Sequence, residues 1–145
     1  MTKRLVRKGH CYRCIYTWRM RHRVPAMCPR CKSRLWDVPK IRPVTLGNGL
    51  GIEEVIGPHR DEIMRLARRH GVRRLFVFGS VRRREATEQS DVDLLVEWRR
   101  IPSLLGHASL ANDIERAVGR PVDLVNRGDL HWAVSPQVEA EAVPL

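Results

Sequence analysis

Two stretches decide the fold: Phe76-Val77-Phe78-Gly79-Ser80 and, ten residues further on, Asp91-Val92-Asp93-Leu94-Leu95-Val96. The first is an apolar run that ends in a Gly-Ser turn, and the second is an apolar run that opens with two carboxylates. On a β-strand, residues i and i+2 point to the same face, so Asp91 and Asp93 could bind a divalent cation between them. A third acid, Asp123, lies in the short apolar run Pro121-Val122-Asp123-Leu124-Val125. Strands disfavour Asp and burial of an unpaired charge is costly, so acids in two strand-like runs predict a metal site.

Each acid also has a simpler explanation when it is taken alone. Asp91 could be a turn residue, and Asp93 could be an edge charge that prevents further strand pairing. The order and spacing of Gly79, Ser80 and the three aspartates together favour the metal site.

These residues resemble the signature of the DNA polymerase β-type nucleotidyltransferases, in which Gly-Ser is followed by Asp-x-Asp and a later single Asp. More closely, residues 52–145 resemble the minimal nucleotidyltransferases that are often antitoxin partners of HEPN-domain toxins. The closer resemblance rests on the runs Phe76–Ser80, Glu85-Ala86-Thr87, Ser90–Glu97, Pro121–Val125 and Glu141-Ala142-Val143-Pro144-Leu145. It implies an α/β fold, with a mixed sheet flanked by helices as in the polymerase β-like palm. It also implies an enzyme that transfers AMP from ATP to a tyrosine hydroxyl of a HEPN toxin.

The chemistry of nucleotidyl transfer gives each residue a role. The reaction depends on positioning and on neutralising the charge of the triphosphate, and two Mg²⁺ ions about 3.5–4 Å apart can bind the attacking and leaving oxygens. We expect Asp91 and Asp93 to bridge the two ions, and Asp123 to complete one metal site and to accept the proton of the attacking hydroxyl. Gly79 would let the backbone approach a phosphate, to which the Ser80 hydroxyl and neighbouring N–H groups would donate.

The loop after Ser80 departs from the family pattern. The family has a small residue, Arg and Gly at this point, whereas this chain has Arg82-Arg83-Arg84. Arg83 aligns with the family's Arg, and we expect it to contact a phosphate; a solvated basic loop is the alternative. If the loop requires a positive φ at the position of the family's Gly, Arg84 is strained there.

All four cysteines of the chain form two pairs, Cys11-x2-Cys14 and Cys28-x2-Cys31, with thirteen residues between the pairs. The basic N-terminus has no apolar segment behind it and does not resemble a signal peptide, and no run is apolar and long enough to span a membrane. We therefore expect a cytoplasmic protein, in which thiols stay reduced and such pairs indicate a structural Zn²⁺ site. The segment resembles a zinc ribbon, particularly over Cys28–Asp37; disulfides or uncoordinated thiols are the alternative.

Other side chains of this segment suggest core and surface roles. His10 and His22 lie close to the cysteines in sequence, but four thiolates already fill the coordination shell of zinc. We assign Trp18 and Trp36 to the core, because so small a module has little else to pack around its metal. Tyr12 is the better candidate for an exposed residue that stacks on a nucleic-acid base.

Charge is distributed very unevenly along the chain. Residues 1–43 contain 13 Lys or Arg and one acid, Asp37, a balance of +12, whereas residues 44–145 contain 14 basic and 15 acidic residues. Even with the −2 charge of a zinc held by four thiolates, the first segment stays near +10 by this arithmetic, which favours nucleic acid as a partner. A solvated basic surface is the alternative.

Proline and glycine divide the chain into a basic zinc ribbon (1–43), a linker (44–51) and a minimal nucleotidyltransferase domain (52–145). The patterning predicts a helix from Pro58 to Gly71, strands over 72–78, 92–98 and 122–126, a helix around 110–118 and a short helix over 136–142. Two further functions stay open: transfer of a nucleotide to RNA or a small molecule, and a catalytically idle scaffold that neutralises its partner by contact.

Overall fold

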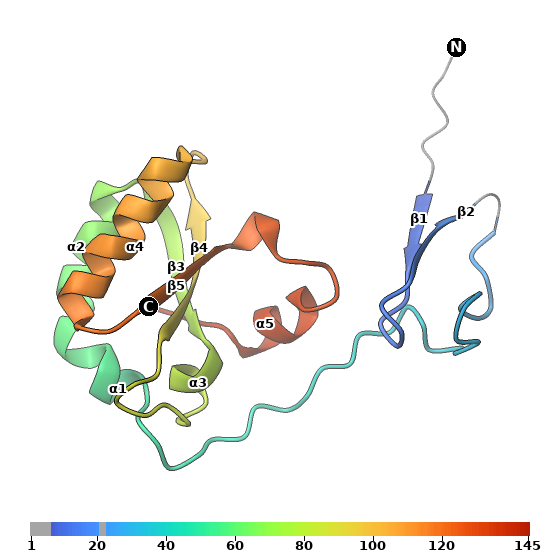
Figure 1. The fold of residues 1–145 in the computed structure, drawn as a ribbon, viewed down its shortest axis with the longest axis horizontal. Helices are drawn as coiled ribbons and strands as arrows, with labels where there is room; N and C mark the ends of the chain where they lie inside the picture. Colours follow the sequence, from blue (N-terminus) through green and yellow to red (C-terminus); the bar gives the residue numbers. More distant parts are fainter. Residues whose placement is uncertain (1–6, 21–22) are drawn as a thin grey trace.

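The computed structural model describes residues 7–20 and 23–145, which form two sheets (Figure 1). The strands are β1 (Arg7–His10), β2 (Thr17–Met20), β3 (Val72–Phe78), β4 (Val92–Trp98), β5 (Val122–Asn126) and β6 (Val143–Pro144). The helices are α1 (Ile52–Val55), α2 (Arg60–Arg69), α3 (Gly79–Arg82), α4 (Leu104–Val118) and α5 (Ser135–Glu141), with 3-10 turns at Gly57–His59 and Arg127–Asp129. None of the helices in these ranges is long and apolar enough to cross a membrane.

The larger sheet is mixed and has the strand order β5-β4-β3-β6. Strand β4 is antiparallel to β3 and parallel to β5, and α4 makes the crossover that a parallel connection requires. The sequence prediction of an α/β fold with a mixed sheet is therefore confirmed, and the three predicted strands have the expected bounds. Strand β6 was not predicted, because two residues are too few to show a period of alternation.

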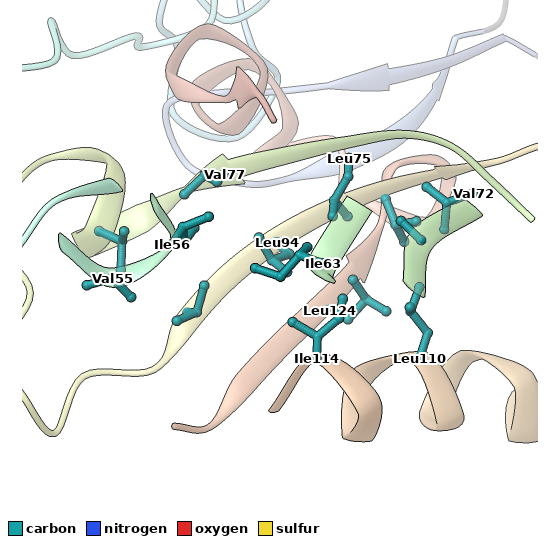
Figure 2. Close-up of a cluster of buried hydrophobic side chains, with 14 of the residues drawn as sticks. Val55, Ile56, Ile63, Val72, Leu75, Val77, Leu94, Leu110, Ile114 and Leu124 are labelled. Carbon is teal, nitrogen blue, oxygen red and sulfur yellow. The ribbon is translucent and has the colours of Figure 1, made fainter. Parts of the chain in front are cut away.

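The core lies between the sheet and the helices α2 and α4, which run side by side across one face (Figure 1). Ile63 of α2 and Leu110 and Ile114 of α4 point at strand residues such as Leu75 and Leu94 (Figure 2). All five side chains are at most 3% exposed. Helix α4 begins six residues before the predicted Leu110, because the hydroxyl of Ser103 accepts a hydrogen bond from the Gly106 N–H at 3.2 Å and caps the helix.

The glycine-rich stretch that was predicted as a linker runs beside the loop that follows α3. The N–H groups of Gly47 and Gly49 donate to the carbonyls of Arg83 (2.8 Å) and Arg84 (2.6 Å), and Leu50 forms a β-bridge with Ala86. A Cβ at Gly47 would lie 2.7 Å from the Arg84 carbonyl oxygen. These glycines therefore allow one backbone segment to approach another closely.

The N-terminal segment is a β1–β2 hairpin followed by the second cysteine pair. Trp36 is 6% exposed and packs with the buried Cys11 and Cys28, while Trp18 lies edge-on against it with ring centroids 5.0 Å apart. The indole N–H of Trp36 donates to the Pro25 carbonyl at 3.0 Å. The structure agrees with the assignment of both tryptophans to this small core; His22 lies outside the described residues.

Candidate active site

The Gly-Ser turn lies at the end of β3, directly opposite the aspartates. Gly79 has φ +71°, and a Cβ at this position would overlap Oδ2 of Asp93. Gly79 is therefore required both by its backbone conformation and by the close approach of the carboxylate. Its N–H donates to Glu141, so in this structure that group does not face a phosphate position.

The sheet places Asp93 and Asp123 next to each other. They are paired residues of the parallel strands β4 and β5, and Phe78, the last residue of β3, pairs with Asp93 on the other side. Asp91 precedes β4 by one residue and is exposed, as is Asp123, whereas Asp93 is half-buried. The three acids thus gather at one end of the sheet beside the Gly-Ser turn.

Electrostatics at this end of the sheet favour the binding of a cation. Burial, together with repulsion from Asp91 and Asp123, raises the pKa of Asp93 to about 6, although Arg83 and the Ser80 N–H act in the opposite direction. The neighbouring carboxylates thus disfavour the charged form of Asp93, and a divalent cation would relieve this repulsion.

The residues fit a magnesium–triphosphate ligand. Carboxylate oxygens are the ligands that Mg²⁺ prefers. The Ser80 hydroxyl is buried and has no hydrogen-bond partner within residues 7–20 and 23–145, which leaves a donor for a phosphate oxygen. The ligand atoms of the four cysteines all lie within 4.8 Å of one another. In the described ranges, the three aspartates do not form such a compact group.

The three arginines that follow Val81 all have hydrogen-bond partners within the fold. The Nε of Arg82 donates to the Glu141 carbonyl at 3.2 Å. Arg83 donates to Glu85 (2.8 Å) and to Glu141 (2.7 Å), and the first of these bonds is the main cause that raises its pKa. Arg83 is therefore held by two ion pairs, in contrast to the solvated basic loop that was the alternative.

Arg84 has the positive φ that the comparison with the family pattern suggested. Its φ is 56°, in the left-handed region. Its guanidinium is bonded to Glu54 of α1 at 2.8 Å. The pKa of Glu54 is lowered most by its own backbone N–H, then by the Gly51 N–H and then by this bond from Arg84.

Sequence reasoning did not assign a role to Glu141, which the structure places in the site. It is 5% exposed, and its Oε1 accepts from the Gly79 N–H at 2.6 Å and from Nη1 of Arg83 at 2.7 Å. It lies 62 residues from Gly79 in sequence. The available signal was its place in the closing run that carries the family resemblance.

The four cysteines form one compact cluster. The Sγ atoms of Cys11 and Cys31 lie 3.7 Å apart and those of Cys14 and Cys28 lie 3.8 Å apart, which excludes a disulfide in this structure. Zinc–sulfur bonds of about 2.3 Å at tetrahedral angles give sulfur–sulfur separations of about 3.8 Å. The cluster therefore has the dimensions of a zinc site with four cysteine ligands.

The two cysteine knuckles have the same backbone design. The N–H of Ile15 donates to the Cys11 carbonyl at 2.9 Å, and the N–H of Lys32 donates to the Cys28 carbonyl at 3.0 Å. Ile15 and Lys32 have φ values of 59° and 61°. Left-handed residues are costly for L-amino acids, and a β-branched Ile is a clear outlier, so the knuckles hold this shape against local preference.

The prediction that Tyr12 is an exposed stacking residue was wrong. Tyr12 is half-buried, because Trp132 of the segment between β5 and α5 lies edge-on to it with ring centroids 5.3 Å apart. His10 also packs on Trp132, at 4.6 Å. The exposed aromatic is Tyr16, which stacks on Trp18 and lies under the guanidinium of Arg30, 5.6 Å from its ring centre.

Comparisons with known proteins give the family. The model of the nucleotidyltransferase domain matches residues 61–145. The chain belongs to this family. It is 42% identical over 92 residues to protein adenylyltransferase MntA of Thermococcus cleftensis, covering 63% of this chain and 90% of that protein. A protein of Methanocaldococcus jannaschii, assigned as a protein adenylyltransferase, is 35% identical over 84 residues, 58% of this chain and 90% of that one.

Solved structures agree with the fold. A structure assigned as a minimal nucleotidyltransferase is 40% identical and superposes with a TM-score of 0.59, covering 68% of this chain and all of that one. A toxin–antitoxin structure with AMP-PNP, at 22% identity and a TM-score of 0.53 over 58% of this chain and 69% of that one, shows the same fold. The protein is a nucleotidyltransferase related to the MntA adenylyltransferases.

Proposed function

We propose that this nucleotidyltransferase transfers AMP from ATP to a hydroxyl of a partner protein, a tyrosine of a HEPN toxin, and acts as the antitoxin of that toxin. The observation that carries the proposal is the gathering of Asp91, Asp93 and Asp123 beside a buried Ser80 hydroxyl that has no hydrogen-bond partner in the described part of the chain. The choice of a protein acceptor is supported by the relative named protein adenylyltransferase, of which this chain spans 90%.

The residues of the site divide the reaction between them. Two Mg²⁺ ions, when bound, would neutralise charge on the triphosphate. Asp91 and Asp93 would be their shared ligands, while Asp123 would complete one site and accept the proton of the attacking hydroxyl. The Ser80 hydroxyl and the Arg83 guanidinium would bind phosphate oxygens, and Gly79 would allow the turn to approach Asp93. In the reaction, a bond from the acceptor oxygen to the α-phosphorus would form as the bond from the α-phosphorus to the pyrophosphate leaving group breaks.

Labelled ATP tests the proposal most directly. The full-length protein is incubated with Mg²⁺, ATP labelled on the α-phosphate, and the HEPN-domain protein encoded nearest to it, and the label on each protein is measured. We expect label on the HEPN protein, abolished when its tyrosines are replaced by Phe and abolished in the Asp91→Asn/Asp93→Asn enzyme. Label that appears on RNA or a small molecule would contradict the proposal, as would neutralisation of the toxin without any transfer.

We further propose that residues 1–43 are a zinc ribbon, that it packs on the catalytic domain at residues 52–145 through His10, Tyr12 and Trp132, and that the ribbon binds nucleic acid. The sulfur–sulfur distances support zinc. The exposed side chains of Arg19, Arg30 and Lys32 belong to the same small segment as the exposed Tyr16, so a charged surface and a stacking ring occur together.

Charge-matched variants test the nucleic-acid surface. We expect Arg19→Gln/Arg30→Gln to weaken binding of duplex DNA or RNA, and the removal of each phosphate contact should flatten the log–log salt dependence by about 0.9 on duplex DNA. Arg68→Gln/Arg69→Gln removes the same charge from exposed positions of α2 and is the control. Equal effects of the two double variants, or no binding by the intact protein at low salt, would contradict the assignment.

A further inference from the structure

One buried carboxylate joins the end of the chain to the loop of the candidate active site. Glu141 is the buried charged residue of the described ranges, and it lies at the last position of α5. We propose that Glu141 is a positioning residue for nucleotidyl transfer: it fixes the Gly79 peptide and the Arg83 guanidinium so that Ser80 and Arg83 face the triphosphate. This inference rests on the proposed function of the site.

The first step of the argument concerns the Gly79 peptide. Its N–H is directed at Oε1 of Glu141 at 2.6 Å, a short bond of the kind that a charged acceptor gives. The Gly79 Cα lies so close to the Asp93 carboxylate that a Cβ would overlap Oδ2, so a shift of the backbone toward Asp93 at this point is blocked. Glu141 therefore acts on the Asp93 carboxylate and on Ser80 through the backbone between them.

The second step concerns Arg83. Its Nε is bonded to Glu85 and its Nη1 to Glu141, so two acids hold the guanidinium plane from two sides. Neither bond uses Nη2, and the side chain is 34% exposed. A guanidinium has five N–H donors, so Arg83 keeps donors for a phosphate oxygen while its orientation is fixed.

The third step concerns why stability alone does not explain a buried carboxylate at this position. Burying a carboxylate is costly, and a buried ion pair is weak evidence for stability. Glu141 nevertheless joins α5 to the one loop that carries Gly79, Ser80 and Arg83. A stabilising pair could lie at any position in the fold, but these contacts act on the atoms that the reaction needs in a fixed geometry.

The test compares two substitutions of Glu141 with a matched control. Glu141→Gln keeps an acceptor for the Gly79 N–H but removes the charge opposite Arg83, whereas Glu141→Ala removes both. The control is Glu139→Gln, because Glu139 lies on the same helix but pairs with a different arginine, Arg127, away from the loop. We expect kcat to fall about 10–100-fold for Glu141→Gln and further for Glu141→Ala, with a smaller change in KM for ATP and no change for Glu139→Gln.

A double-mutant cycle with Arg83→Gln tests whether Glu141 acts through Arg83. We expect the double variant to lose no more activity than the less active single variant, because the two residues form one unit. Additive losses, or a change in unfolding temperature with kcat unaltered, would overturn the assignment. Tighter binding of ATP by Glu141→Gln would also overturn it, because the carboxylate would then be a competitor for the phosphate position.

Two measurements need no acceptor and so separate this inference from the proposed function. In glycine-labelled protein, the Gly79 amide should give an NMR signal far downfield that moves upfield in Glu141→Gln and stays in place in Glu139→Gln. Binding of a non-hydrolysable ATP analogue with Mg²⁺ should weaken in Arg83→Gln and in Glu141→Ala. If the wild type binds the analogue but labels no protein, the proposed acceptor fails and the role of Glu141 stands; an unmoved Gly79 signal overturns the role of Glu141 itself.

Discussion

Arg84 gives the sharpest test of how the catalytic loop, residues 79–84 beside the three aspartates, is held. Its φ of 56° is costly for any residue other than glycine, by about 1–2 kcal/mol. Arg84→Gly removes this strain, but it also loses the exposed and therefore weak pair with Glu54, and it costs roughly 0.5–1 kcal/mol because glycine gains freedom on unfolding. The net change from wild type is therefore close to zero, and wild type is the wrong reference.

The informative comparison is Arg84→Gly with Arg84→Ala, because neither variant has the ion pair. Alanine keeps the strain, so we expect the free energy of unfolding of Arg84→Gly to exceed that of Arg84→Ala by about 1 kcal/mol. With a urea m-value of about 1–3 kcal/mol/M, the midpoints should differ by roughly 0.3–1 M. Urea unfolding of the zinc-loaded protein, followed by circular dichroism, measures this difference.

Arg82 is the matched control, since it lies two residues away in the helical turn α3 and its side chain also bonds an acceptor of the fold. There the order should reverse, with Arg82→Ala more stable than Arg82→Gly by about 0.5–1 kcal/mol. If Arg84→Ala is as stable as Arg84→Gly, or if both positions show the same order, the left-handed conformation at Arg84 does not carry the strain we assign to it.

Three further predictions concern the two candidate metal sites. Asp93→Asn should abolish nucleotidyl transfer without lowering the stability of the metal-free protein, because it removes a repelled charge; a variant within a few-fold of wild-type transfer would contradict this. Because the pKa of Asp93 is raised to about 6, ionisation of Asp93 between about pH 4 and 6 should destabilise the metal-free fold. For the same reason, Mg²⁺ binding should weaken as the pH falls through 6. Equal increases in unfolding temperature on addition of Mg²⁺ at about pH 5 and about pH 7.5 would contradict this prediction. Protein prepared without chelator should contain about one Zn²⁺ per chain. Cys28→Ser should unfold the hairpin, because structural zinc contributes about 10–16 kcal/mol of apparent binding free energy in such peptides, while the affinity for the ATP analogue stays unchanged.

The strands of the catalytic domain could be predicted from sequence because the information is local. Val72–Phe78, Val92–Trp98 and Val122–Asn126 are short runs rich in valine, leucine and aromatic residues that begin directly after Gly71, Asp91 and Pro121, and the structure gives these same bounds. Asp93 and Asp123 are each the second residue of their strand, but their place beside each other depends on the parallel pairing of β4 with β5, which neither segment shows by itself.

The tertiary contacts that were missed depend on residues far apart in the chain. Nothing near Glu141 in sequence indicates that its carboxylate meets Gly79, and nothing near Tyr12 indicates that Trp132 covers it. The same holds for Gly47 and Gly49, whose composition is typical of a flexible linker but which lie against the carbonyls of the catalytic loop. Sequence patterns specify which elements form, whereas these contacts depend on where the elements meet.

The catalytic loop shows why an arginine can stand where the family pattern has glycine. The loop is held on three sides: by the backbone of residues 47–50, by Glu54 of α1 and by Glu141 of α5. A strained residue persists only where the surroundings over-determine its conformation. Here the backbone bonds from Gly47 and Gly49 fix the carbonyls of Arg83 and Arg84, so the positive φ is imposed from outside the loop, and the pair with Glu54 gives the arginine a partner in that conformation. The departure from the family pattern is thus accommodated by contacts that leave Gly79, Ser80 and the three aspartates in place.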